Sequence, residues 1–151
     1  MKKTKLIVIA ALLIVLSLGA LGCGGKYTAI APDGKPFSYT NLEEYYTAPA
    51  VYDYLIEQLD AAMESYSSVY SDYSVDFSGN TITYSYNFVD GVDAEAIKAN
   101  LESQDMSAQL EQAASQIEQE TKIKPEQVIY IYNDVNGNEI YKVASDLAVT
   151  E

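Results

Sequence analysis

The clearest pattern along the chain is a strict alternation of apolar and polar residues from Tyr73 to Phe88. It is interrupted only at Gly79-Asn80, a dipeptide that favours a two-residue turn between two strands. A turn there pairs Phe77 with Ile82 and places all the apolar side chains on one face, which a slip of one residue would reverse. The pattern therefore predicts a β-hairpin with one buried face and one wet face.

Helical spacing of apolar residues predicts two helices before this hairpin. Thr40 and Glu43 have the spacing of a capping box, which predicts a short helix through Thr47. Pro49 stands where a second helix can begin, because its missing N–H would have no partner in the first turn. The second helix carries one apolar stripe, at Val51, Tyr54, Leu55, Leu59, Ala62, Met63 and Tyr66.

A further helical segment follows the hairpin and runs toward Thr121, with Asp90 or Asp93 as its cap. Its apolar residues form two sets on roughly opposite sides of a helix: Ile97, Leu101 and Ala108, and then Met106, Leu110, Ala113 and Ile117. One straight helix cannot bury both sets against one sheet. We therefore expect a break near Gln104 to Ser107; the alternative is one long helix that contacts a second body on its far side.

The last regular segments are two strands, Val128 to Asn133 and Glu139 to Val143, on either side of Asp134-Val135-Asn136-Gly137. Asp at the first turn position and Gly at the last favour a type I turn followed by a glycine bulge. The resulting register places two isoleucines of the first strand in the core, opposite Val143 and Tyr141.

The same register places Tyr130 and Tyr132 on the opposite face, beside Lys142 and Ile140. There we expect the two tyrosines to be partly exposed. Exposed tyrosines suit contacts with proteins or sugars, because a rigid ring adds contact area at a low cost in entropy. Tyr130 and Tyr132 are therefore the candidate ligand-contact residues, with ordinary packing as the alternative.

The element order is helix, hairpin, helix, hairpin, which predicts an α+β fold with an antiparallel sheet of about four strands and helices packed on one face. We expect one domain over residues 40–146, with a short tail at 147–151. Residues 23–39 contain two prolines and several glycines but few periodic apolar positions, and this composition predicts a flexible tether.

The chain begins with three lysines, followed by an apolar run from Leu6 to Leu21. This arrangement is typical of an export signal peptide, here residues 1–22. The end of the run, Ala20-Leu21-Gly22-Cys23, resembles the bacterial lipobox, and the resemblance implies that a diacylglycerol is attached to the sulfur of Cys23. The alternative is a lone cysteine in an uncleaved anchor helix.

The composition excludes several kinds of chemistry. The net charge is -13, and removal of the three N-terminal lysines would make it more negative, so nucleic acid is not an expected partner. There is no His and no Arg, which excludes histidine-based acid–base chemistry and bidentate phosphate binding. No metal site or cofactor is predicted, because the acidic loop Asp134 to Glu139 lacks the ligand spacing of a calcium site.

Three short stretches together resemble a family of Firmicutes surface lipoproteins whose domain has no known function. They are Asn41-Leu42-Glu43-Glu44-Tyr45, the turn Gly79-Asn80-Thr81, and the segment Val128 to Tyr141 with its Asn136-Gly137 turn. The resemblance covers residues 41–144. It implies a small secreted α+β domain and supplies no catalytic residues.

These observations favour a non-enzymatic binding domain outside the cytoplasm, held on the membrane by a lipid at Cys23, with an envelope protein or glycan as its partner. Two alternatives stay open. One is a hydrolase of the cell envelope that uses carboxylates alone, and the other is a surface protein that binds divalent cations diffusely. The acids Asp53, Glu57, Asp60 and Glu64 could serve either alternative, but their spacing is that of a solvated helix face.

Overall fold

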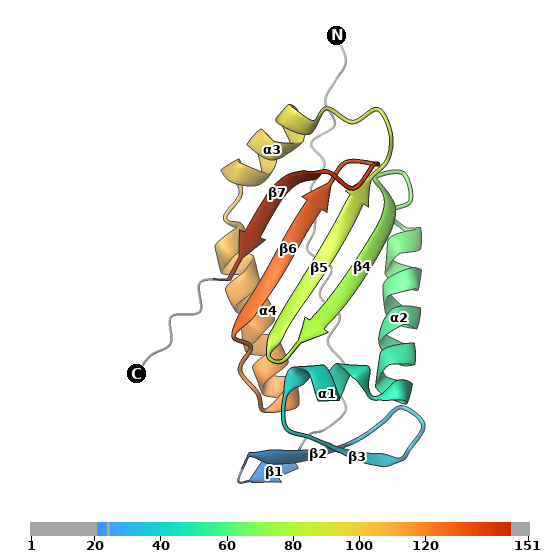
Figure 1. The fold of residues 1–151 in the computed structure, drawn as a ribbon, viewed down its shortest axis with the longest axis vertical. Coiled ribbons are helices and arrows are strands. Elements are labelled where there is room, and N and C mark those ends of the chain that lie inside the picture. The colour runs from blue at the N-terminus through green and yellow to red at the C-terminus, as the bar shows by residue number, and fades with distance from the viewer. Residues whose placement is uncertain (1–20, 24, 146–151) are drawn as a thin grey trace.

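The computed structural model describes residues 21–23 and 25–145, and within them the chain folds into two sheets and four helices (Figure 1). The smaller sheet has strand order β1-β2-β3 and the larger one β4-β5-β6-β7. The strands are β1 Leu21–Cys23, β2 Lys26–Ile30, β3 Pro36–Tyr39, β4 Tyr70–Ser78, β5 Thr81–Phe88, β6 Gln127–Asn133 and β7 Glu139–Ala144. The helices are α1 Leu42–Thr47, α2 Pro49–Glu64, α3 Ala94–Ser103 and α4 Met106–Thr121.

The hairpin of β4 and β5 has the register that the alternating pattern predicts. Phe77 pairs with Ile82, and two further predicted pairs, Val75 with Tyr84 and Tyr73 with Tyr86, also form. Gly79 takes a positive φ of 59° at the turn, a conformation that glycine adopts at little cost.

The larger sheet is mixed, so the prediction of a purely antiparallel sheet is wrong at one pairing. β5 and β6 run parallel, while the outer pairs β4–β5 and β6–β7 are antiparallel. The reason lies in the connection: α3 and α4 carry the chain from the end of β5 back to the start of β6. A helical crossover of this kind joins parallel strands.

The predicted register of the last hairpin is wrong by one residue. Tyr130 pairs with Val143 and Tyr132 with Tyr141, whereas the isoleucines of β6 pair with Lys142 and Ala144. Tyr130 and Tyr132 are therefore in the core with 0% exposure, and the expectation that they are partly exposed is wrong. An irregularity between Tyr132 and Asn133 shifts the pairing at the turn and accounts for the slip.

The helix boundaries agree closely with the sequence pattern. α1 ends at Thr47 and α2 begins at Pro49. The predicted break between α3 and α4 is confirmed, because Gln104 takes an extended conformation between them. The predicted capping box is displaced by one residue: Asn41 caps α1 by accepting a hydrogen bond from the backbone N–H of Glu44.

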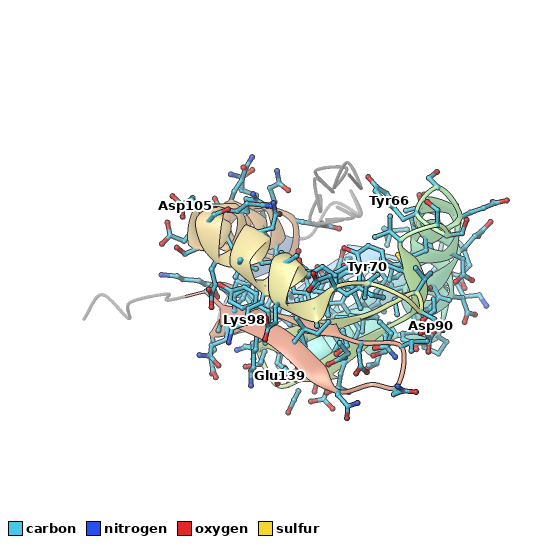
Figure 2. All side chains as sticks on the ribbon, turned by 90° about the horizontal axis from the view of Figure 1, so that it is seen from above. Tyr66, Tyr70, Asp90, Lys98, Asp105 and Glu139 are labelled. Atoms are coloured by element: carbon cyan, nitrogen blue, oxygen red, sulfur yellow. The ribbon has the colours of Figure 1, made fainter. Side chains whose placement is uncertain are left out.

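The helices lie on one side of the larger sheet, as the view along the long axis shows (Figure 2). The inner face of β5 consists of four buried residues, Ile82, Tyr84, Tyr86 and Phe88. The alternate residues of β5 are Thr81, Thr83, Ser85 and Asn87, which are partly exposed on the outer face. The core therefore lies between one face of the sheet and the helices.

Residues 26–39 are not the flexible tether expected from their composition. β2 and β3 pair as an antiparallel hairpin, in which Ala29 and Tyr39 are each only 1% exposed. The hydroxyl of Tyr39 donates a hydrogen bond of 2.8 Å to the backbone oxygen of Thr121, which ties the hairpin to the end of α4. The glycine and prolines here belong to a tight turn and a strand start.

Residues 1–20 and 146–151 lie outside the described part of the chain, and so does the side chain of Cys23. The signal peptide, the C-terminal tail and the lipidation of Cys23 therefore stay predictions. Among the helices that are described, none has the length and hydropathy needed to cross a membrane.

Candidate binding site

Aromatic rings cover the inner face of the central strands. We call this set the tyrosine face: it consists of Tyr70, Tyr84, Tyr86, Phe88, Tyr130 and Tyr132. The parallel register aligns Tyr84 with Tyr130 and Tyr86 with Tyr132, so the rings stack in pairs. Their centroids are 5.3 Å and 5.7 Å apart, within the range of favourable aromatic contacts.

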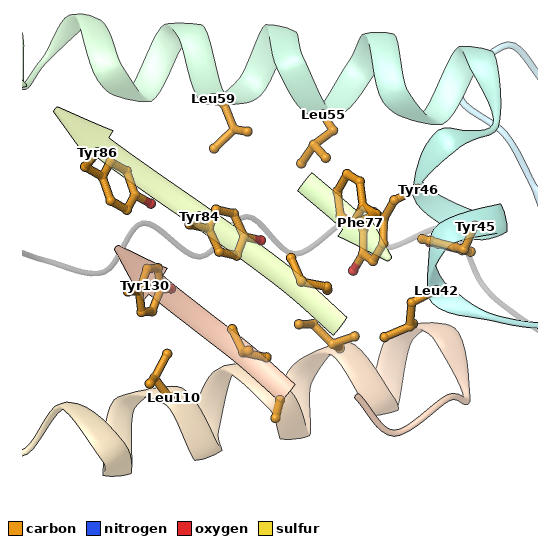
Figure 3. Close-up of a cluster of buried hydrophobic side chains, with 14 of the residues drawn as sticks. Leu42, Tyr45, Tyr46, Leu55, Leu59, Phe77, Tyr84, Tyr86, Leu110 and Tyr130 are labelled. Carbon is orange, nitrogen blue, oxygen red and sulfur yellow. The ribbon is translucent and has the colours of Figure 1, made fainter. Parts of the chain in front are cut away.

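Aliphatic side chains from two helices enclose the tyrosine face on either side. Leu55 and Leu59 point toward it from α2, and Leu110 points toward it from α4 (Figure 3). All three leucines are at most 1% exposed. The rings of β5 and β6 thus project into an apolar layer between α2 and α4.

Three hydroxyl groups of the tyrosine face have no hydrogen-bond partner among the described residues. They belong to Tyr86, Tyr130 and Tyr132, and the three oxygen atoms are buried. An unpaired buried hydroxyl costs about 1–3 kcal/mol of stability. Phenylalanine would fill the same positions without the cost.

Two other buried tyrosines of this protein do have partners. The Tyr39 hydroxyl donates to the backbone oxygen of Thr121, and the Tyr45 hydroxyl donates to Oε1 of Glu120 at 3.1 Å. Unpaired hydroxyls are therefore not a general feature of the core. They are concentrated at the centre of β5 and β6.

The three unpaired hydroxyls are protonated at neutral pH, as any tyrosine is, and burial raises their pKa further. It raises the pKa of Tyr130 to about 12, and it raises the pKa of Tyr86 and of Tyr132 above the usual tyrosine range. The further causes at Tyr86 and Tyr132 are neighbouring tyrosines, with no carboxylate or ammonium group among them. Each of the three groups can thus donate a hydrogen bond in surroundings without formal charge.

The end of the core near α1 differs from the three unpaired hydroxyls in its charge, because the carboxylate of Glu120 interacts with the tyrosines there. Besides accepting from Tyr45, Glu120 contributes to the raised pKa of Tyr39, Tyr46 and Tyr84, although burial is the largest cause in each case. Glu120 was not among the residues predicted from the sequence. Glu120 follows Ile117 by three residues, so its carboxylate lies next to the apolar stripe of α4. This position was the signal in the sequence from which its role could have been predicted.

The structure brings Tyr130 and Tyr132 together, with ring centroids 6.4 Å apart, but at a buried position instead of the predicted surface. Their neighbour Tyr86 was not predicted as a candidate, because the alternating pattern assigns it to the buried face of its hairpin. The available signal was the choice of tyrosine at several adjacent core positions where phenylalanine would suffice.

The acids that could serve the alternative functions are at the surface. Asp53, Glu57, Asp60 and Glu64 are exposed along α2, and Asp60 accepts a hydrogen bond from the hydroxyl of Tyr73 at 2.6 Å. Within the described residues, no three His, Cys, Asp or Glu side chains are grouped so that they could hold a metal ion.

In the acidic loop of the last hairpin, the carboxylate of Asp134 forms hydrogen bonds within the loop itself. Asp134 accepts hydrogen bonds from the backbone N–H groups of Asn136 and Asn138, and also from the side-chain amide of Asn138. These bonds, chiefly those from Asn138, lower the pKa of Asp134. The loop is therefore explained as a hairpin turn.

Comparison with known proteins gives one match. Residues 42–144 match a family described as a domain of unknown function (DUF4854). A search of curated proteins and a search of solved structures each found no match.

Proposed function

Since the chain belongs to the DUF4854 family, a domain of unknown function, its role has to be argued from its own geometry, and we propose that it is a lipid-anchored binding domain outside the cytoplasm. Its ligand is an envelope component that it takes at the tyrosine face, between α2 and α4. The domain works by binding and carries out no reaction.

The observation that carries this proposal is the set of three unpaired hydroxyls at Tyr86, Tyr130 and Tyr132. Buried polar groups in stable proteins are almost always hydrogen-bonded, and exceptions call for an explanation. A core built for packing alone would use phenylalanine at these positions. Three adjacent donors that the fold does not satisfy are explained if a bound molecule supplies their acceptors.

Native mass spectrometry tests the binding part of the proposal. The full-length protein is taken from producing cells in phosphatidylcholine nanodiscs and is compared with the triple variant Tyr86→Phe, Tyr130→Phe, Tyr132→Phe. We expect a bound small molecule on the wild type and a loss of at least tenfold in its occupancy on the triple variant, because the rings remain and only the donors are lost.

The matched control is Tyr52→Phe, Tyr54→Phe, which removes two hydroxyls from exposed positions on α2. It should retain the bound molecule in full. Equal occupancy in the wild type and the triple variant, or an unoccupied wild type, would contradict binding at the tyrosine face.

The anchor part of the proposal is supported by the lysines, the apolar run and the small residues that precede Cys23. A Cys23→Ser change should abolish labelling by a radioactive fatty acid and should release the protein into the medium. Membrane retention that does not change in this variant argues against the lipid anchor.

A further inference from the structure

The chemistry around the three unpaired hydroxyls also restricts the kind of molecule that fits them. We propose that the tyrosine face takes an uncharged amphiphile, with oxygen atoms that accept hydrogen bonds from Tyr86, Tyr130 and Tyr132 and with an apolar body that lies along α2 and α4. This inference rests on the proposed function and adds the class of ligand to it.

Three unpaired donors call for a ligand with several acceptor atoms. The rings of Tyr86, Tyr130 and Tyr132 have centroids 5.7–6.4 Å from one another, so the three residues form a compact triangle. Three donors thus belong to one small region of the core, and a head group with two or three oxygen atoms offers a similar number of acceptors. Hydroxyl and ester oxygens both accept hydrogen bonds from a tyrosine hydroxyl.

The charges around the tyrosine face favour an uncharged head group. All six lysines in the described part of the chain are exposed, so none can neutralise an anionic head group in this layer. The carboxylate of Glu120 acts on the neighbouring Tyr84 and further disfavours an anion. A cation would face protonated donors, and no carboxylate affects the pKa of Tyr86, Tyr130 or Tyr132. Because a buried charge without a partner is costly, an uncharged head group is favoured.

Apolar side chains surround the rings of the tyrosine face. Leu55, Leu59 and Leu110 approach the rings from α2 and α4 (Figure 3), and they offer apolar contacts to a hydrocarbon body. The buried core also contains Met63 of α2 and Met106 of α4. Methionine is flexible and fits irregular shapes. Apolar sides with a few placed polar groups are typical of sites for small molecules.

Thermal unfolding with two matched probes tests this inference. Monocaprin has an uncharged glycerol head group, and caprate carries the same acyl chain with an anionic head group. Both are added to the full-length protein in phosphatidylcholine nanodiscs. At a hundredfold excess over its Kd, monocaprin should raise the Tm of the wild type by about 10 °C. Caprate at the same concentration should raise it by less than a third of that shift.

The triple variant Tyr86→Phe, Tyr130→Phe, Tyr132→Phe should have a Tm equal to or above that of the wild type and should lose the monocaprin shift. The variant Tyr52→Phe, Tyr54→Phe should keep the full shift. The inference is overturned if caprate acts as strongly as monocaprin, if monocaprin has no effect, or if the triple variant still responds. A molecule found on the wild type but not on the triple variant by mass spectrometry, without a monocaprin shift, would mean that the site exists but takes another class of ligand.

Discussion

At the scale of single residues, two buried tyrosines of this core differ in whether the hydroxyl group has a hydrogen-bond partner. Tyr39 and Tyr130 are each at most 1% exposed and lie in the same core. The Tyr39 hydroxyl is paired with the backbone oxygen of Thr121, whereas the Tyr130 hydroxyl has no partner among the described residues. The same chemical change at the two positions should therefore have opposite effects.

We expect Tyr130→Phe to raise the free energy of unfolding of the ligand-free protein by about 1 kcal/mol, because it removes an unsatisfied buried group. Tyr39→Phe should lower the free energy of unfolding by about 1–2 kcal/mol, because it leaves the Thr121 carbonyl without its donor. Urea denaturation after removal of bound small molecules measures both changes. If both variants lose stability to the same extent, the Tyr130 hydroxyl has a partner within the folded protein.

The residue scale also shows why the site was not predicted from the sequence. Ile129 and Ile131 are more apolar than Tyr130 and Tyr132, so hydropathy alone assigns the isoleucines to the core. The structure reverses this, because the parallel pairing aligns the tyrosines of β6 with the row Tyr84 and Tyr86 of β5. Stacking across the two strands is a tertiary interaction that no local pattern reveals.

At the scale of elements, the turn between β4 and β5 also holds the start of α1. The side-chain oxygen of Asn80 accepts a hydrogen bond from the backbone N–H of Leu42 at 3.0 Å. The backbone N–H of Gly79 donates to the carboxylate of Glu43 at 2.8 Å, and the N–H of Glu43 donates to the Gly79 carbonyl at 2.9 Å. Free N–H groups at a helix start need such partners.

Replacing Asn80 with alanine should therefore lower the free energy of unfolding by about 1 kcal/mol, the usual loss when a helix N-terminus loses a side-chain acceptor. Hydrogen exchange at the Leu42 amide should become faster in this variant. Asn80→Asp is the matched control, because its carboxylate still offers an acceptor, and it should retain slow exchange. An unchanged exchange rate at Leu42 in the alanine variant would show that the contact does not stabilise α1.

Elements whose signal is local were predicted well from the sequence. The β4–β5 register follows from strict alternation around Gly79-Asn80, and the break at Gln104 follows from two apolar sets on opposite sides of one helical segment. The features that were missed depend on longer connections. The parallel pairing of β6 is set by the crossover through α3 and α4, and the last register by an irregularity beside Asn133.

The N-terminal hairpin was missed for another reason. Its glycine and prolines resemble a tether in composition, but Tyr27, Ala29, Phe37 and Tyr39 alternate on strands that pair with each other. These strands are too short for the period-two pattern to stand out. Their burial depends on α4, to which Tyr39 donates a hydrogen bond, and on α1, whose Tyr45 packs against the Tyr39 ring.

At the scale of the whole molecule, the sheet has one aromatic face covered by helices (Figure 2) and one outer face, on which the small polar side chains of β5 lie beside Ile129 and Ile131 of β6. The net charge of -13 keeps such a protein away from anionic surfaces, while the exposed acids along α2 face the solvent. The surface therefore does not attract an anionic ligand and adds nothing to the affinity for one. In our account, the affinity for a ligand comes from the uncharged interior between α2 and α4, where the unpaired hydroxyls lie.

The most direct measurement is a high-resolution electron-density map of the full-length protein crystallised as it is isolated from producing cells. Our account predicts elongated density between α2 and α4, with oxygen atoms within hydrogen-bond distance of the hydroxyls of Tyr86, Tyr130 and Tyr132. Density for isolated waters alone at these hydroxyls, or protein side chains that move in to pair with all three, would contradict it.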